Sequence, residues 1–217
     1  MVDILFNETE IRVLGSLVEK AITTPENYPL SLNALINACN QKSNRDPMVN
    51  YTGQEVNAAL QSLRERGLIR VIMGGDSRVP KYREYFAEAF SLSAPEVAIL
   101  CELMLRGAQT PGELRGRGER FGVNLSVQEV ETALDTLAAR TEPLVVKLPL
   151  RPGRKEARYA QLLAGQPVIN EEEAAPPTPS FGTASDRLAQ LEAETRDLRQ
   201  ELADLRQQFN DLKAQFE

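Results

Sequence analysis

The feature that most constrains the fold is an internal repeat in the first three-quarters of the 217-residue chain. NETEIRVLGSLVEKAITTPENYPL aligns with LSAPEVAILCELMLRGAQTPGEL at a constant offset of 86, which pairs Leu14 with Leu100 and Thr24-Pro25 with Thr110-Pro111. Each copy has the apolar spacing of an amphipathic helix, a capping residue three positions before a glutamate, and a Thr-Pro break. The repeat therefore predicts two copies of one helical unit.

A second pair of segments follows at an offset of 74, where TGQEVNAALQSLRERGLIRVIM aligns with SVQEVETALDTLAARTEPLVVKL. Each begins as an amphipathic helix and continues into a β-prone run, a turn with Gly and Arg, and a last short strand. Three helices followed by a β-hairpin, twice, predict two tandem winged-helix domains, so the fold class is mainly α with small β-hairpins (α+β). We expect middle helices at 31–40 and 111–121, third helices at 53–66 and 127–139, and hairpins from 68–73 to 81–83 and from 144–148 to 158–160. The third helix is the one that enters a major groove when such a fold binds DNA.

The last quarter of the chain has a different pattern. Residues 164–185 are rich in Pro, Ala, Glu and Ser, which predicts a disordered linker between the winged-helix domains (1–90 and 91–163) and the rest. Apolar residues then alternate at spacings of three and four, which predicts a coiled-coil helix at 186–217. Its flanking charges attract each other in a parallel pair, so we expect a homodimer; a helix folded back on its own chain is the alternative. The expected dimerisation residues are Leu188, Leu191, Leu198, Leu202, Leu205, Phe209, Leu212 and Phe216.

The chain contains no histidine, and its two cysteines, Cys39 and Cys101, lie in helix-periodic apolar runs. Without histidine, Ser-His-Asp catalysis, Cys-His catalysis and His-ligated metal sites are excluded. Walker and dinucleotide-binding spacings are missing as well. We therefore expect no enzyme, no cofactor and no metal site. The segment MVDILFNETE does not resemble a signal peptide, and no run approaches the ~20 apolar residues of a membrane helix, so we expect a cytoplasmic protein without a membrane partner.

The net charge of −6 belongs to the tail. Residues 1–90 carry ten Lys and Arg against eleven Asp and Glu, and residues 91–163 carry ten against nine. Residues 164–217 carry five against eleven. The two predicted domains are thus almost neutral, which is unlike a strongly basic nucleic-acid-binding protein.

A polar insertion distinguishes the first repeat. The offset falls from 86 to 74, so the first unit holds about twelve extra residues, NQKSNRDPMVNY, between its second and third helices. Lys42 and Arg45 are its only cations. Amide side chains often satisfy backbone groups in irregular segments, so the insertion is either a self-bonded loop or a contact surface for DNA or a protein.

Several polar and basic side chains are candidates for nucleic-acid contacts. The third helix of the first unit carries Gln, Asn and Arg opposite its apolar face, and these residue types read base edges. The corresponding helix of the second unit exposes Gln128, Glu131 and Asp135, which would repel phosphate, but the middle helix and the second hairpin carry arginines. The charged hairpin tip is equally explained as protection against edge-to-edge pairing. The candidates are Gln54, Asn57, Gln61, Arg64, Lys42, Arg45, Arg78, Lys81, Arg115, Arg117, Arg151, Arg154, Lys155 and Arg158.

The segments YPLSLNALINACNQKSNRDPMVN, KYRE and LMLRGAQTPGELR together resemble the YceH-like family of bacterial proteins, from about residue 8 to residue 163. The resemblance implies tandem winged helices followed by a C-terminal coil. Two functions follow as hypotheses. The first is a DNA-binding, transcription-regulator-like protein that contacts double-stranded DNA. The second is a protein–protein interaction adaptor that uses its winged helices without binding DNA.

Overall fold

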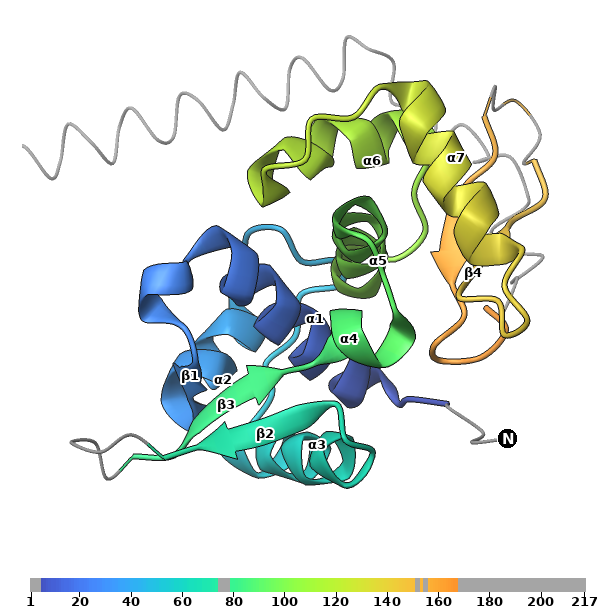
Figure 1. Cartoon of the computed structure of the whole chain (residues 1–217). Helices are drawn as coiled ribbons and strands as arrows, with labels where there is room; N and C mark the ends of the chain where they lie inside the picture. Colours follow the sequence, from blue (N-terminus) through green and yellow to red (C-terminus); the bar gives the residue numbers. More distant parts are fainter. Residues whose placement is uncertain (1–4, 74–78, 151–152, 154–155, 168–217) are drawn as a thin grey trace, which may run out of the picture. The chain divides into compact units, whose positions relative to one another are not determined.

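The computed structural model describes residues 5–73, 79–150, 153 and 156–167, all within one compact unit that spans residues 1–170 (Figure 1). Within these residues seven α-helices accompany two small antiparallel sheets, so the predicted α+β class is confirmed. None of the helices described is long and apolar enough to cross a membrane. The predicted linker and coiled-coil helix, with all eight dimerisation residues, lie outside the described residues.

The first repeat contains three helices and then a hairpin, in the predicted order. Reciprocal hydrogen bonds fix the start of two helices, with Asn7 and Glu10 capping the first and Thr52 and Glu55 capping the third. A short strand that the sequence did not predict joins the hairpin, giving the sheet order β1-β3-β2. The elements are α1 (Glu8–Thr23), β1 (Leu30–Ser31), α2 (Leu32–Asn40), α3 (Gly53–Glu65), β2 (Ile69–Ile72) and β3 (Lys81–Glu84), with a 3-10 turn at Pro25–Asn27.

The second repeat has the same order. Its third helix is capped by Ser126 and Glu129, as the third helix of the first repeat is by Thr52 and Glu55. The short helix α4 (Phe86–Phe90), which the sequence did not predict, precedes this repeat, and its Phe86 is fully buried. The other elements are α5 (Ala94–Arg106), α6 (Pro111–Gly118), a 3-10 turn at Glu119–Phe121, α7 (Val127–Ala138), β4 (Val145–Lys147) and β5 (Tyr159–Gln161).

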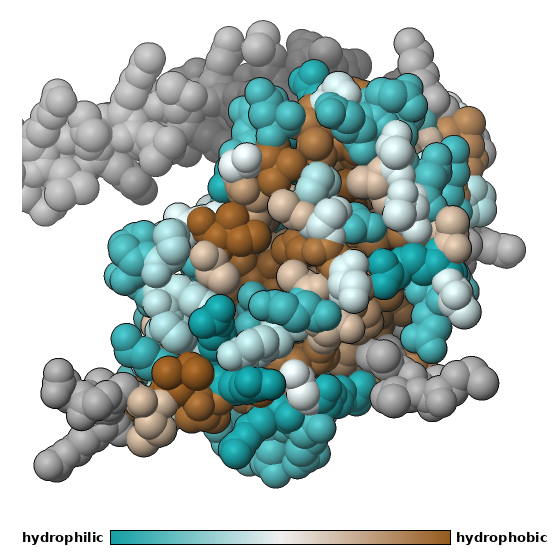
Figure 2. All heavy atoms as spheres, in the orientation of Figure 1, coloured by the Kyte–Doolittle hydropathy of each residue, from teal (hydrophilic) through white to brown (hydrophobic). Residues whose placement is uncertain are grey.

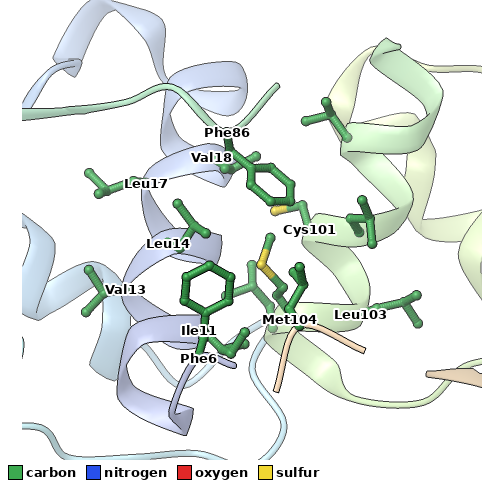
Figure 3. Packing of buried hydrophobic residues seen from close by; sticks show 14 of the residues in the cluster. Phe6, Ile11, Val13, Leu14, Leu17, Val18, Phe86, Cys101, Leu103 and Met104 are labelled. Atoms are coloured by element: carbon green, nitrogen blue, oxygen red, sulfur yellow. The ribbon is translucent and has the colours of Figure 1, made fainter. Parts of the chain in front are cut away.

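One hydrophobic core runs through both repeats, because α1 packs against α5. In Figure 3, Leu14 and Val18 of α1 face Cys101 and Met104 of α5 across the contact. The Cys101 thiol donates to the Gly15 carbonyl at 3.4 Å. Gly15 and Cys101 are equivalent positions of the repeat, and a contact between equivalent positions is what a local two-fold arrangement produces.

Candidate functional site

The exposed face of α3 carries the polar side chains that the sequence singled out. Val56, Leu60 and Leu63 are buried on the opposite face, so the helix is anchored by one stripe and presents the other to solvent. The structure thus brings four of the candidates together on one solvent-facing surface. All four are exposed: Gln54, Asn57, Gln61 and Arg64.

A groove of about 470 Å³ lies between α3 and the first hairpin. Asn57, Gln61 and Arg64 line its helix side, and Val71 and Tyr82 line its hairpin side. Hydrophilic side chains cover much of the region of α3 and the hairpin in Figure 2. A polar helix face beside a hairpin is an arrangement that can lie along a grooved, charged ligand such as a duplex.

The hairpin adds further cations to this region. Lys81, a predicted candidate, is exposed at the start of β3, and Arg78 lies outside the described residues. Two further exposed arginines, Arg70 and Arg83, were missed by the sequence analysis. The signal that could have found them is the alternation of side chains along the two strands. When IRVI pairs with KYRE, this alternation places both arginines on one face of the hairpin.

The polar insertion is mainly a self-bonded loop. The side chain of Asn40 donates to the Tyr51 carbonyl and accepts from the Tyr51 N–H, both at 2.8 Å, so it closes the loop like a backbone pair. Gln41 donates to the Ser43 carbonyl at 2.8 Å. The loop also reaches the second repeat, since the Asp46 N–H donates to the Leu105 carbonyl at 2.9 Å. Of the two interpretations left open by the sequence, these contacts support the loop.

Arg45 is buried, and this corrects its place among the candidates for a contact surface. Its guanidinium donates to both carboxylate oxygens of Glu19, at 3.0 and 2.5 Å, and to the Ala38 carbonyl at 2.8 Å. A buried carboxylate needs a partner of opposite charge, and that requirement draws the arginine inward. Lys42, the other cation of the insertion, is exposed.

Glu19 and Arg45 belong to a cluster of four charged residues between the repeats, three of them buried and the fourth, Arg120, half-buried. Arg120 donates to Glu19 at 2.6 Å, and its Nε lies 2.8 Å from an oxygen of Glu102. That N–H is not directed at the oxygen, so neither Glu102 oxygen accepts a hydrogen bond from a described residue. We call Glu19, Arg45, Glu102 and Arg120 the interface cluster.

The two carboxylates of the interface cluster differ in their pKa. Burial by itself raises the pKa of Glu19, but the hydrogen bonds and charge of Arg45, together with the charge of Arg120, outweigh burial and leave that pKa lowered. For Glu102 burial prevails over the charge of Arg120, and the pKa is raised. The cluster is occupied by its own ion pairs, which is the arrangement of a structural contact.

Both cysteines are buried and free. Burial raises the pKa of the Cys39 thiol to about 11, and it also raises the pKa of the Cys101 thiol. The thiolate is the nucleophile and metal ligand, so neither residue is activated for such chemistry. No group of three or more Cys, Asp and Glu side chains within the described ranges is placed to hold a metal ion.

The candidates of the second repeat do not form one surface where they are described. Arg115 is exposed on α6, but Arg117 donates to the buried Gln109 side chain. Arg158 donates to the Ala108 carbonyl at 2.5 Å and to Glu113 at 3.0 Å. Arg151, Arg154 and Lys155 lie outside the described residues.

The α7 surface differs in charge from the α3 surface. Gln128 and Asp135 are exposed and Glu131 is half-buried at its edge. By the offset of 74, Glu131 and Asp135 occupy the positions of Asn57 and Gln61. Carboxylates at these positions repel a phosphate backbone, so the two helices cannot serve the same anionic ligand.

Comparison with known proteins places the chain among bacterial relatives of similar length. Residues 6–154 match the model of the family described as "Protein of unknown function, DUF480". A UPF0502 protein of Citrifermentans bemidjiense is 55% identical over 186 residues, which cover 86% of each chain. A UPF0502 protein of Koribacter versatilis is 51% identical over 197 residues, 90% of this chain and 91% of the relative. One of Geobacter sulfurreducens is 49% identical over 201 residues, again 90% and 91%.

Proposed function

The chain belongs to the DUF480 family of bacterial proteins, and on this premise we propose that it binds double-stranded DNA as a transcription-regulator-like protein. The contact surface is α3 of the first repeat together with the adjoining hairpin. Each repeat is then a winged helix, as the resemblance to the YceH-like proteins implies, with α3 as the helix that enters the major groove.

One observation carries the proposal: exposed amide and guanidinium side chains on α3 lie beside a hairpin whose exposed cations form no salt bridge with a described carboxylate. Asn, Gln and Arg form the paired hydrogen bonds that distinguish bases in the major groove. Asn57, Gln61 and Arg64 line the groove between helix and hairpin. Arg64 supplies positive charge at the groove itself, and Lys81, Arg70 and Arg83 supply it on the other face of the adjoining hairpin.

The predicted coiled coil extends the proposal. A parallel homodimer would carry two copies of the α3 surface on one assembly. Dimers of helix-turn-helix proteins bind two half-sites about one helical turn apart, and a longer connection relaxes that spacing. The DNA site would then contain two copies of a short sequence.

The test is fluorescence anisotropy of labelled genomic duplexes at salt concentrations from 50 to 200 mM. We expect binding that weakens steeply with salt, and a loss of at least tenfold in affinity for N57A/Q61A/R64A. The matched control is E131A/D135A, which changes the equivalent positions of α7 and leaves affinity equal or higher. If no duplex binds at 50 mM salt, or if the α3 variant binds as tightly as the native protein, the proposal is wrong.

A second function, a protein–protein interaction adaptor, is favoured by the α7 surface. Its exposed Gln128 and Asp135, with Glu131 beside them, suit a basic partner surface. The adaptor hypothesis predicts that the protein retains one stoichiometric partner on affinity purification after nuclease treatment. E131K/D135K should then release that partner, whereas N57A/Q61A/R64A should not.

A further inference from the structure

Two arginines lie directly opposite each other on the first hairpin. Arg70 of β2 pairs with Arg83 of β3 in the antiparallel register, and both side chains are exposed. Both guanidinium groups lie over one aromatic ring, with Cζ of Arg70 4.5 Å and Cζ of Arg83 5.5 Å from the centroid of Tyr85. The two arginines are therefore cross-strand neighbours, and each guanidinium is positioned by the same ring.

This pair is electrostatically unfavourable by itself. Like charges directly opposite on a sheet repel each other, and no carboxylate of the described residues lies within 4 Å of either guanidinium to offset them. Glu84, the nearest acidic neighbour in the chain, instead accepts a hydrogen bond from the Phe86 N–H at 2.7 Å. The face of the Tyr85 ring attracts both cations, which orients them without neutralising their charge.

The fold does not require arginines at these positions. In the first repeat the Leu68 N–H donates to the Leu63 carbonyl, and the Leu68 carbonyl accepts from the Tyr85 N–H. In the second repeat the Leu144 N–H donates to the Leu137 carbonyl, and the Leu144 carbonyl accepts from the Leu162 N–H. These matching hydrogen bonds align the two hairpins. The positions of Arg70 and Arg83 are then taken by Val146 and Ala160, which also pair directly. The two cations are thus a property of the first hairpin and not of the scaffold.

The arginine pair is separate from the groove beside α3. Successive side chains of a strand point to opposite faces, and Val71 and Tyr82 line the groove. Arg70 and Arg83 therefore belong to the other face of the hairpin. A group bound there leaves the groove open.

We propose that Arg70 and Arg83, oriented by Tyr85, form a binding site for a phosphate group. A guanidinium presents its N–H donors in a planar fork that matches phosphate oxygens, and two such groups side by side bind one tetrahedral dianion or one backbone phosphate from two directions. The phosphate has two sources, a nucleic-acid backbone or a free phosphate compound. Binding of a nucleic-acid phosphate at this site rests on the proposed function, whereas the site itself does not depend on it.

The site is tested first with inorganic phosphate alone. Arginine Nε–Hε signals of the full-length protein are followed by NMR during titration with phosphate against chloride of equal ionic strength. We expect saturable shifts of the Arg70 and Arg83 signals, identified by their loss in R70Q and R83Q. R70K/R83K, which keeps the charge without the fork, should bind phosphate several-fold more weakly. The control is K147Q, because Lys147 is a single cation 5.7 Å from the Tyr159 ring on the second hairpin.

The second measurement distinguishes the two sources. For a labelled duplex, R70Q/R83Q should reduce the slope of log affinity against log salt by about 0.9, which corresponds to the one DNA phosphate that the variant no longer neutralises, and K147Q should leave the slope unchanged. Phosphate shifts with an unchanged slope support the site and assign it to free phosphate compounds. A protein that binds no duplex overturns the proposed function, while the NMR titration still decides the site. Absence of saturable phosphate shifts overturns the site.

Discussion

In the first repeat the strand after the third helix begins beside Leu68, and in the second it begins beside Leu144; both leucines make the same two backbone hydrogen bonds. Tyr82 and Tyr159 also correspond, since each pairs with a short extended segment from before its repeat's middle helix. The exposed positions do not correspond in chemistry, with Gln61 on α3 against Asp135 on α7. Packing in the shared fold constrains the buried positions, whereas the solvent-facing positions are free to differ. The two repeats therefore have similar folds and different surfaces.

The repeats also differ in what they contribute to their common interface. The first repeat adds the insertion, which delivers Arg45 to Glu19. The second repeat has no insertion and delivers Arg120 from the turn after α6. The packing of α1 against α5 is therefore locally symmetric, whereas the charged contacts beside it are asymmetric. The added residues of the first repeat serve the contact between the repeats as well as the interior of one.

The largest effect is expected from breaking the charged contact made by the insertion. Arg45→Met leaves the buried Glu19 with Arg120 and the more distant Lys20, and should lower the free energy of unfolding by about 3 kcal/mol, since an incompletely paired buried charge is costly. Urea denaturation followed by circular dichroism measures this change. Glu19→Met combined with Arg45→Met should recover much of the loss, because replacing both partners by apolar residues is far less damaging.

The matched control for this experiment is Lys42→Met, in the same insertion but exposed. It should change the free energy of unfolding by less than about 0.5 kcal/mol. Equal urea midpoints for Arg45→Met and Lys42→Met would show that the insertion does not stabilise the interface.

A second substitution addresses the helix contact between the repeats. A Cβ atom at Gly15 would lie 3.0 Å from Leu105 Cδ2 and 3.2 Å from Met104 Cβ, both in buried side chains. Gly15→Val should therefore lower the free energy of unfolding by about 1–3 kcal/mol through overpacking. Gly116 of α6 has nothing within 4 Å of such an atom, so Gly116→Val should be nearly neutral. Thermal unfolding of both variants tests the α1–α5 contact, which is contradicted if the two behave alike.

The interface cluster predicts a pH effect through Glu102. Its pKa is raised in the folded state, first by burial, so the folded protein binds this proton more tightly than the unfolded chain does. The resulting stability is fully present below the unfolded pKa of about 4.3 and is lost as pH rises through the higher folded pKa. Glu102→Gln removes this dependence. The stability of the native protein relative to Glu102→Gln should rise as pH falls from 7 to 5, by less than about 1.4 kcal/mol per pH unit.

Urea titrations at pH 5, 6 and 7 measure the difference for Glu102→Gln. Glu142→Gln, at an exposed position, is the control and should show no such trend. A relative stability of the native protein that falls toward pH 5 would contradict the raised pKa of Glu102.

The smallest expected effect comes from the N-caps of α3 and α7, and it tests whether the two third helices are equivalent. The N–H of Glu55 donates to Thr52 at 3.3 Å and that of Glu129 donates to Ser126 at 3.2 Å. Thr52→Ala and Ser126→Ala should each lower the free energy of unfolding by about 1 kcal/mol. Chemical denaturation of the two variants should give similar values. A large difference between them would mean that the two helices contribute unequally to the cooperative unit.

The sequence by itself determined the local elements of this protein. The period of the apolar residues, the capping pairs and the Thr-Pro breaks are properties of neighbouring residues, so α3 and α7 were predicted within one residue and the starts of α1 and α5 followed from their caps. The exposed face of α3, with Gln61 and Arg64, followed from the same period. The two-residue strand β1 and the five-residue helix α4 were too short to produce a period and were missed.

Tertiary structure alone decided which charges are buried and which surfaces adjoin. Arg45 looked like a solvent-exposed cation because its neighbours in the sequence are polar, yet its partner Glu19 lies 26 positions away on α1. Arg70 and Arg83 became a pair only through strand register. Contacts between distant residues depend on how helices and strands pack, and periodicity within one element carries no information about that packing.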